Sequence, residues 1–500
     1  MILVCRTDAS VAIGTGHVMR CLALAQAWQD AGGQAIFAIA EATAAVRERL
    51  QQQGFQILSV EAAPGSLEDA RSLSALAKDA AAGWLVVDGY CFDDEYQRAL
   101  KREGFKILFI DDYGNARHYA ADFILNQNAA AQESDYPNRE SCTRLLLGAR
   151  YALLRREFVA ESARPREIPP VARRVLITMG GSDPQNFAEC AMRAFARVNI
   201  EGAEAIVVAG GSNPHTESLE RTAAELGGKL RVKNNVSNMA ELMSWADVAV
   251  SGAGSTCWEL CRMGLPALTV DVAQNQRSLA RELDRRGCTI HLGSADSVSE
   301  QVIADRLQWL MNSEEKRQSL WQRGRELVDG KGARRVAAAL LSGNLRLRRA
   351  VEGDCRLLWE WANDPDVRAA SFSPGKIPWD THVAWFEDKL RQDGSIILVA
   401  ERDGIPVGQI RFDKNGNREA DIGISLARER RGQGIAGNLI CLGVDEVFRD
   451  PRFQRINAYV KQENVSSIRA FEHAGFRRVG VTNVKGNVAV HFVYERNSRD

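Results

Sequence analysis

The fold is decided by one stretch of the sequence, Ala246-Asp247-Val248-Ala249-Val250-Ser251-Gly252-Ala253-Gly254-Ser255-Thr256-Cys257-Trp258-Glu259. Its apolar start predicts a buried strand, its glycines predict a tight turn, and the remainder predicts a helix. Ser255, Thr256 and free backbone N–H groups would lie at the amino end of that helix, where a diphosphate would fit. Glu259, about one turn further in, is placed to accept hydrogen bonds from ribose hydroxyls, although an exposed helix glutamate is the alternative.

The same strand, loop and helix pattern recurs on either side of this stretch. The loop Gly180-Gly181-Ser182-Asp183-Pro184 follows one predicted strand, and Gly210-Gly211-Ser212-Asn213 follows the next. The glycines would let the backbone approach an anion, Ser182 or Asp183 could cap a helix, and Pro184 suits the first helical position. The strands predicted here are Val175–Thr178, Ala205–Val208, Val248–Val250 and Ala267–Val270.

The first third of the chain has the same alternation of apolar runs and amphipathic helices. Its predicted strands are Ile2–Cys5, Ala35–Ile39, Trp84–Val87, Lys106–Ile110 and Phe123–Leu125. A proline-bearing segment at 161–170 is typical of a linker. We therefore expect two Rossmann-like α/β domains, residues 1–160 and 161–342, that face each other across a cleft. Ligands in such sheets bind beyond the carboxyl ends of the strands.

A histidine opens the first helix, which we expect from about Gly16 to Asp30. The preceding Gly14-Thr15-Gly16 resembles the start of a dinucleotide fingerprint, but Met19 occupies the third glycine position. The positive end of the helix dipole disfavours imidazolium, so His17 is biased towards the neutral form that a general base requires. A structural histidine that caps or packs at the helix start is the alternative.

Three further polar clusters follow strands of the first domain: Asp88-Gly89-Tyr90, Asp111-Asp112-Tyr113 and Asn126-Gln127-Asn128. Each can be a turn or a helix cap, which is the commoner use of such aspartates. Together they predict an open polar face at the carboxyl edge of the sheet.

The pattern of predicted helices and strands changes near residue 343. Leu345-Arg346-Leu347-Arg348 opens a segment with two helices, followed by short strands at Ile396–Ala400, Val407–Phe412 and Ala420–Leu426, which predicts an α+β domain over residues 343–500. The segment Arg428–Ala436 then bares backbone N–H groups beside basic side chains at a helix start. That pattern favours a pyrophosphate site over a basic solvated turn.

Bulk composition excludes several classes of function. The 500 residues carry a formal net charge of +0, so nothing predicts attraction to nucleic acid or to an anionic membrane. The chain has 10 cysteines without a CxxC pair, and Cys257 and Cys261 have no second pair to complete a zinc site. We expect reduced thiols, a cytoplasmic enzyme and no metal.

Residues 1–340 resemble the GT-B sugar-nucleotide enzymes, and within that group the UDP-sugar hydrolases of pseudaminic acid biosynthesis. The closest features are residues 6–10 and 13–25, Asp111-Asp112-Tyr113 and Asn126-Gln127-Asn128. The resemblance implies that water activated by His17 attacks the anomeric carbon and UDP leaves, with Tyr90 and Asn275 near the sugar. The UDP-sugar-binding residues that we expect are Gly14, Gly16, Gly180, Gly181, Ser182, Gly254, Ser255, Thr256, Glu259 and Gln276.

Residues 345–497 resemble the GCN5-related N-acetyltransferases, whose R-x-x-G-x-A signature matches Arg431, Gly434 and Ala436. Ala474-Gly475-Phe476 resembles the next block of the family. The acetyl-CoA-binding residues that this implies are Leu426, Arg431, Gly432, Gln433, Gly434, Ile435, Ala436, Asn464 and Ser467.

The acid and base of this second reaction stay open. Many members of the family have a tyrosine that reprotonates the thiolate where this chain has Phe471, so the proton donor is Tyr459, His473 or water. The base for the acceptor amine is Asp421 or His382, and packing in a helix is the alternative role of His382.

Both resemblances point to one pathway, in which an acetyltransferase supplies the substrate of the hydrolase. They imply that the chain N-acetylates the UDP-linked 4-amino-4,6-dideoxy-β-L-AltNAc sugar with acetyl-CoA and then removes UDP. Two alternatives remain. The first is a GT-B glycosyltransferase fused to an acetyltransferase. The second is a UDP-sugar-binding module without catalytic activity that regulates the acetyltransferase. The sequence carries no signal for an oligomeric state.

Overall fold

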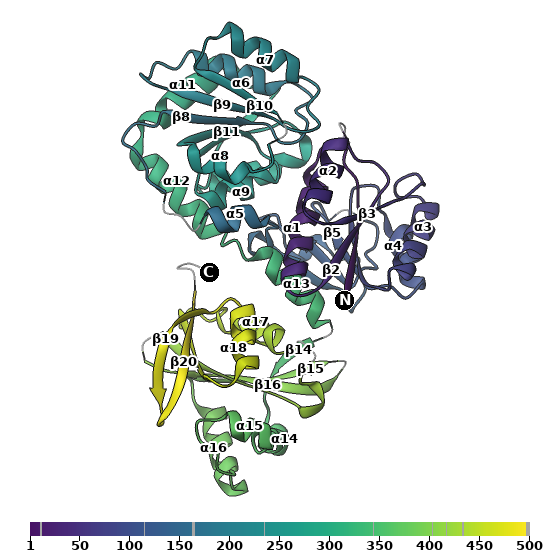
Figure 1. Ribbon diagram of the computed structural model, residues 1–500, viewed down its shortest axis with the longest axis vertical. Coiled ribbons are helices and arrows are strands. Elements are labelled where there is room, and N and C mark those ends of the chain that lie inside the picture. Colours follow the sequence, from purple (N-terminus) through teal and green to yellow (C-terminus); the bar gives the residue numbers. More distant parts are fainter. Residues whose placement is uncertain are drawn as a thin grey trace. The chain divides into compact units, whose positions relative to one another are not determined.

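The chain divides into two compact units, Met1–Ala337 and Ala338–Asp500. The computed structural model (Figure 1) describes residues 1–10, 13–114, 116–162, 166–234, 236–343, 345–402, 404–416, 418–432 and 435–496, without the side chains of Asn275 and Ser342. The boundaries expected at residues 160 and 342 stay predictions.

A seven-stranded parallel sheet forms the first part of the larger unit, in the order β3-β2-β1-β4-β5-β6-β7. Its strands are β1 (Ile2–Thr7), β2 (Gln34–Ile39), β3 (Gln56–Ser59), β4 (Ala82–Asp88), β5 (Ile107–Ile110), β6 (Phe123–Asn126) and β7 (Arg144–Leu147). Its helices are α1 (Gly16–Asp30), α2 (Ala44–Gln52), α3 (Leu67–Asp79), α4 (Asp94–Arg102) and α5 (Arg156–Glu161). Side-chain caps define two of the helix starts, since Ser66 accepts from the Asp69 N–H and Asp93 from the Tyr96 N–H.

A second parallel sheet follows, in the order β10-β9-β8-β11-β12-β13. Its strands are β8 (Arg174–Thr178), β9 (Glu204–Ala209), β10 (Leu230–Asn234), β11 (Val248–Gly252), β12 (Ala267–Asp271) and β13 (Ile290–Ser294). Its helices are α6 (Phe187–Ala196), α7 (Thr216–Glu225), α8 (Met239–Trp245), α9 (Thr256–Met263), α10 (Arg277–Arg285), α11 (Glu300–Asn312), α12 (Glu314–Leu327) and α13 (Gly332–Ser342). Val175 and Ile177 of β8 pack with α6 and α11, whereas Leu176 packs with α8 and α9. Helices therefore cover both faces.

The smaller unit is a mixed sheet in the order β14-β15-β16-β17-β18-β20-β19. Its strands are β14 (Leu345–Arg349), β15 (Ser395–Arg402), β16 (Ile405–Lys414), β17 (Glu419–Leu426), β18 (Arg455–Lys461), β19 (Arg477–Val484) and β20 (Asn487–Glu495). Its helices are α14 (Cys355–Ala362), α15 (Pro365–Ala370), α16 (Trp379–Arg391), α17 (Ile435–Val447) and α18 (Val465–His473). The parallel pair β17 and β18 lies at its centre.

The predicted fold class is confirmed: two parallel Rossmann-like sheets precede an α+β unit. Two local expectations were wrong. The segment between β14 and β15 contains three helices, α14, α15 and α16, and not two. Pro184 does not open a helix, because Asp183 turns the chain with a φ of 49° and its carboxylate caps α6, which begins only at Phe187. No helix within the described residues is long and apolar enough to cross a membrane.

Candidate functional site

A cavity of about 510 Å³ lies inside the larger unit, and both parallel sheets contribute to its lining. From the first sheet come the start of α1 and the residues after β4, β5 and β6. From the second come the loops after β8, β9, β11 and β12. The following predicted residues line it: Gly14, Gly16, His17, Tyr90, Gly180, Gly181, Ser182, Gly254, Ser255, Thr256, Glu259 and Gln276. The side chain of Asn275 lies outside the described residues.

His17 is bound to a buried carboxylate on the neighbouring strand β4. Its Nδ1 lies 2.7 Å from Oδ1 of Asp88, and Arg20 donates to the same carboxylate from Nη2 at 2.6 Å and from Nε at 2.7 Å. Burial alone would raise the pKa of Asp88, but the charges of Arg20 and His17 outweigh burial and hold it well below its usual value.

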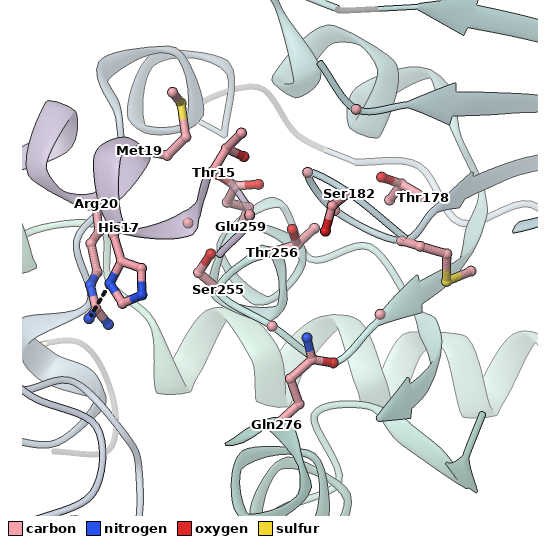
Figure 2. Close-up of a pocket in the computed structure, with 18 of the residues that line it drawn as sticks. Thr15, His17, Met19, Arg20, Thr178, Ser182, Ser255, Thr256, Glu259 and Gln276 are labelled. Atoms are coloured by element: carbon pink, nitrogen blue, oxygen red, sulfur yellow. Dashed lines mark hydrogen bonds between the residues drawn. The ribbon is translucent and has the colours of Figure 1, made fainter. Parts of the chain in front are cut away.

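This arrangement fixes the tautomer of His17. An ionised carboxylate can only accept hydrogen bonds, so Nδ1 carries a proton, and in the neutral imidazole Nε2 is the nitrogen with the lone pair. Figure 2 marks the 3.1 Å approach between Arg20 Nη2 and His17 Nδ1, which follows from two donors sharing one acceptor oxygen. The neutral base that we expected at the helix start thus has a partner, Asp88, which the sequence had indicated only as a polar strand end.

A second set of hydrogen bonds connects Tyr90 with Arg20 through Asp112. Arg20 donates from Nη1 to Asp112 Oδ1 at 2.8 Å, and the Tyr90 hydroxyl donates to Asp112 Oδ2 at 3.0 Å. The Tyr90 ring meets the His17 ring edge-on, with 4.8 Å between centroids. Arg20 was missed at the sequence level, although its position one turn after His17 on the same helix could have suggested it.

Glycine loops from the two sheets approach each other at the cavity. A Cβ on Gly181 would lie 2.4 Å from Thr15 Oγ1, so only glycine fits that position without a shift. Positions 14 and 16 lie close to the Ser182 and Ser255 hydroxyls, respectively. Figure 2 labels Thr15 together with Ser182, Ser255 and Thr256 among the side chains that line the cavity. The two loops are therefore packed closely against each other at this point.

Glu259, which we predicted to bind the ribose, has one of its two carboxylate oxygens in a hydrogen bond. Its Oε1 accepts from Arg155 Nη2 at 2.9 Å. Burial raises the pKa of Glu259, and Arg155 opposes that shift. Arg155 also lines the cavity, as does Arg49, whose guanidinium donates to the carbonyls of Val236 and Ser237. Neither arginine was expected, because their partners lie far away in the sequence.

The described residues contain no group of three or more His, Cys, Asp or Glu side chains that could hold a metal ion.

In the smaller unit, β17 and β18 separate. They pair only from Glu419 to Asp421 on β17 and from Arg455 to Asn457 on β18. Beyond that point the two strands have no pairing with each other among the described residues, so backbone groups at 422–426 and 458–461 face a gap. An extended ligand with amide groups could pair there.

The predicted pyrophosphate loop leads from β17 to α17. Gly432 has a φ of 73°, and Ile435 and Ala436 open the helix, whereas Gln433 and Gly434 lie outside the described residues. Arg431 donates to the Leu426 carbonyl and forms ion pairs with Asp364 and Asp366 at 2.7 and 2.9 Å. Its charge is therefore already neutralised by the protein, which leaves the backbone to bind an anion.

The other predicted residues of this unit have mixed surroundings. Asn464 caps α18 by accepting from the Ser467 N–H at 3.1 Å. Phe471 is buried in the core against Phe492. The Tyr459 ring stacks on His491, and no hydrogen bond of its hydroxyl is found in the described part of the chain.

His382 is buried, and its ring stacks on Phe386. Its Nε2 lies 3.2 Å from the Cys355 carbonyl oxygen, so Nε2 is the donor. Burial lowers the pKa of His382. This geometry favours the packing role over the acid–base role.

Comparison with known proteins separates the two units. Residues 344–477 match the family described as acetyltransferase (GNAT) domain. This segment is a GNAT domain. Residues 175–329 match the glycosyltransferase family 28 C-terminal domain, which covers the second parallel sheet.

Two relatives match longer parts of the chain. An uncharacterized protein of Methanocaldococcus jannaschii is 21% identical over 94% of this chain and 96% of its own length. The UDP-2,4-diacetamido-2,4,6-trideoxy-β-L-altropyranose hydrolase of Campylobacter jejuni is 27% identical over 56% of this chain and 96% of its own length. The larger unit is therefore homologous to that hydrolase.

The GNAT domain also matches solved structures. The aminoglycoside acetyltransferase AAC(6')-Ib in complex with coenzyme A is 22% identical, with a TM-score of 0.28 over 30% of this chain and 95% of that one.

Proposed function

We propose that the chain is a bifunctional nucleotide-sugar enzyme. The GNAT domain N-acetylates the UDP-linked 4-amino-4,6-dideoxy-β-L-AltNAc sugar with acetyl-CoA. The larger unit then hydrolyses the bond between the sugar and UDP. The proposal for the larger unit rests above all on His17, whose tautomer is fixed by Asp88 beside the cavity.

The hydrolysis needs a base on one side of the sugar and an anion site on the other. His17 Nε2 takes a proton from water, the water oxygen bonds to the anomeric carbon, and the bond from that carbon to the phosphate oxygen breaks. The amino end of α9, with Ser255 and Thr256, and the backbone of the Gly180-Gly181 loop stabilise the departing diphosphate. Protein donors suffice for this role, so the proposal requires no metal.

The remaining lining residues hold the rest of the substrate. Glu259 binds the ribose through its second oxygen while Arg155 holds the first. Tyr90 and Gln276 contact the sugar, and we keep Asn275 in that role from the resemblance alone. Homology to the altropyranose hydrolase supports this assignment of substrate.

Acetyl transfer takes place at the separated strands. Acetyl-CoA supplies an activated acetyl group, and its amide-bearing arm suits the unpaired backbone of β17 and β18. The loop from Leu426 to Ala436, with Gly432 at its turn, would hold the pyrophosphate, and Asn464 and Ser467 lie at the start of α18. Tyr459 is our proton donor to the thiolate, since Phe471 has no proton to give. Related GNAT proteins have been solved with coenzyme A and acetyl-CoA.

The test follows free UDP and free thiol with the purified chain and the UDP-linked 4-amino sugar, with and without acetyl-CoA. We expect UDP release to require acetyl-CoA. His17→Ala should lose UDP release by at least about 100-fold while thiol release continues. Thiol release without UDP release in the wild type would contradict the hydrolase assignment.

A glycosyltransferase is the second candidate, because the match to the glycosyltransferase family 28 C-terminal domain favours it. That enzyme would pass the sugar to an organic acceptor and would release UDP only when the acceptor is present. Product analysis distinguishes the two, since the hydrolase yields the free reducing sugar.

A further inference from the structure

Two tyrosine rings lie side by side where the first sheet borders the cavity. Tyr90 lines the cavity and is 54% exposed, and Tyr113, on the turn after β5, is 46% exposed. Their ring centroids are 5.4 Å apart, with 52° between the ring planes. We call Tyr90 and Tyr113 the tyrosine pair. Half-exposed aromatic rings beside a pocket offer an apolar surface on which a ligand can pack.

The tyrosine pair adjoins the base proposed for the hydrolysis. The ring of Tyr90 meets the ring of His17 edge-on, with 4.8 Å between centroids and 81° between planes. A water molecule that gives its proton to His17 lies about 3 Å from the ring nitrogen. The sugar that this water attacks therefore comes close to Tyr90, and substituents of the sugar can reach the neighbouring ring of Tyr113.

Hydrogen bonds fix both tyrosines. The Tyr90 hydroxyl donates to Asp112 Oδ2 at 3.0 Å. The turn that carries Tyr113 is held by the Asp111 carboxylate, which accepts from the N–H groups of Asp112, Tyr113 and Gly114 at 2.9, 3.2 and 2.8 Å. Burial raises the pKa of Tyr113, Asp112 adds to that shift, and a hydrogen bond with Tyr90 opposes it. Tyr113 is therefore uncharged at neutral pH, and the ring faces are the surface that a ligand meets.

The carboxylates that line the cavity already have partners. Among the described residues they are Asp112, Asp183 and Glu259. Asp112 accepts from Arg20 at 2.8 Å, and Glu259 accepts from Arg155 at 2.9 Å. Asp183 accepts from two backbone N–H groups at the start of α6, both at 2.9 Å. None of the three is left as an unpaired anion for a cationic ligand group.

The cavity therefore favours a neutral nitrogen substituent on the sugar over a charged one. Three arginines line it, Arg20, Arg49 and Arg155. A protonated amine on the sugar would lose water and meet these positive charges without a carboxylate of its own, which is costly. An acetamido group carries no charge, and its methyl group can pack on an aromatic ring.

We propose that the tyrosine pair receives the acetyl group that the GNAT domain has placed on the sugar nitrogen, with the acetyl methyl against the ring of Tyr113. The inference rests on the two activities proposed above and adds how the hydrolase site selects its substrate: it accepts the amide and rejects the amine. Tyr113 is then a specificity-determining residue, and the order of the two reactions is set inside the larger unit rather than by the supply of acetyl-CoA.

The test uses three UDP-sugars that differ only at the nitrogen on carbon 4, which is an amine, a formamide or an acetamide. UDP release is measured without acetyl-CoA, so the amine stays unacetylated. In the wild type we expect kcat/KM to be highest for the acetamide and lowest for the amine. Tyr113→Ala should lower kcat/KM for the acetamide by about tenfold, because the methyl group loses its contact. The formamide has no methyl group, so its kcat/KM should stay within about threefold.

Tyr113→Phe is the matched control, since it keeps the ring and should behave like the wild type with all three substrates. Inhibition by UDP, which lacks the sugar, should be unchanged in both variants and shows that the cavity is intact. An equal loss of Tyr113→Ala on the acetamide and the formamide would overturn the inference. So would a wild type that prefers the amine, as cation–π binding of an ammonium predicts. A wild-type chain that hydrolyses none of the three would overturn the proposed function, and the inference with it.

Discussion

At the scale of single residues, the buried carboxylate of Asp88 holds several side chains of the larger unit in place. One carboxylate accepts from His17 and twice from Arg20, while Arg20 also reaches Asp112 and through it Tyr90. Arg20 is itself buried. Burial alone would lower its pKa, but Asp112 and Asp88 outweigh burial and raise it well above its usual value. Asp88 and Arg20 are therefore both charged at neutral pH, and the His17 ring is oriented by a fixed anion.

Asp88→Asn should damage catalysis more than substrate binding. The amide can donate to Nδ1 and favour the wrong tautomer, so we expect kcat for UDP release to fall by about 10²- to 10⁴-fold with a small change in KM. The GNAT reaction of the same preparation, followed by thiol release, serves as the control. An equal loss of both activities would point to misfolding.

The same substitution should cost stability in a pH-dependent way. Breaking a buried pair costs about 3 kcal/mol. The depressed pKa of Asp88 makes its contribution present above the unfolded-state value of about 3.9, and that contribution is lost as the pH falls through the lower folded-state value. The difference in melting temperature between wild type and Asp88→Asn should be full at pH 7 and narrow below about pH 4. A difference that widens in acid would contradict this.

At the scale of elements, the cavity is built from short loops that follow buried strands, and these are the parts that the sequence predicts best. The expected helix Gly16–Asp30 coincides with α1, because its long run of apolar residues and the glycines after it are local signals. The edge strand β19 was missed because its side chains are almost all exposed, so it has no alternation. The edge strand β3 was missed for a related reason, since its side chains are at most half-buried.

The contact of the two glycine loops gives a prediction at this scale. In Gly181→Ala the new methyl group would meet Thr15 Oγ1 at 2.4 Å, so the loops must move apart. We expect KM for the UDP-sugar to rise by roughly tenfold, since about 1–3 kcal/mol of strain is typical of an added methyl group in a tight contact. Gly228→Ala, where nothing lies within 4 Å, is the matched control and should leave KM unchanged. Equal effects of both variants would show that the loop contact is unimportant.

At the scale of the whole molecule, the chain consists of a sugar-nucleotide unit and a GNAT domain, which the sequence predicts from two unrelated sets of motifs. What the sequence could not supply is the pairing of distant side chains. Asp88 follows a strand like many capping aspartates, and only the parallel pairing of β4 with β1 brings it to His17. The gap between β17 and β18 likewise becomes visible only in the structure, where the two strands pair over three residues and then separate.

The division into two units predicts that each works by itself. Residues 1–343 should release UDP from the chemically acetylated sugar, and residues 344–500 should acetylate the amino sugar, each within about threefold of the full chain. Circular dichroism checks that both fragments are folded. A GNAT fragment that is folded yet inactive would contradict the independence of the units.

The boundary between the two units falls inside the helix α13, between Ala337 and Ala338, so the two units follow each other in the chain without a linker. A cell that translates this message makes both units in equal number, whatever the strength of the promoter. Neither can be induced, degraded or lost by deletion of a neighbouring gene while the other persists. The two units are therefore always present in a one-to-one ratio.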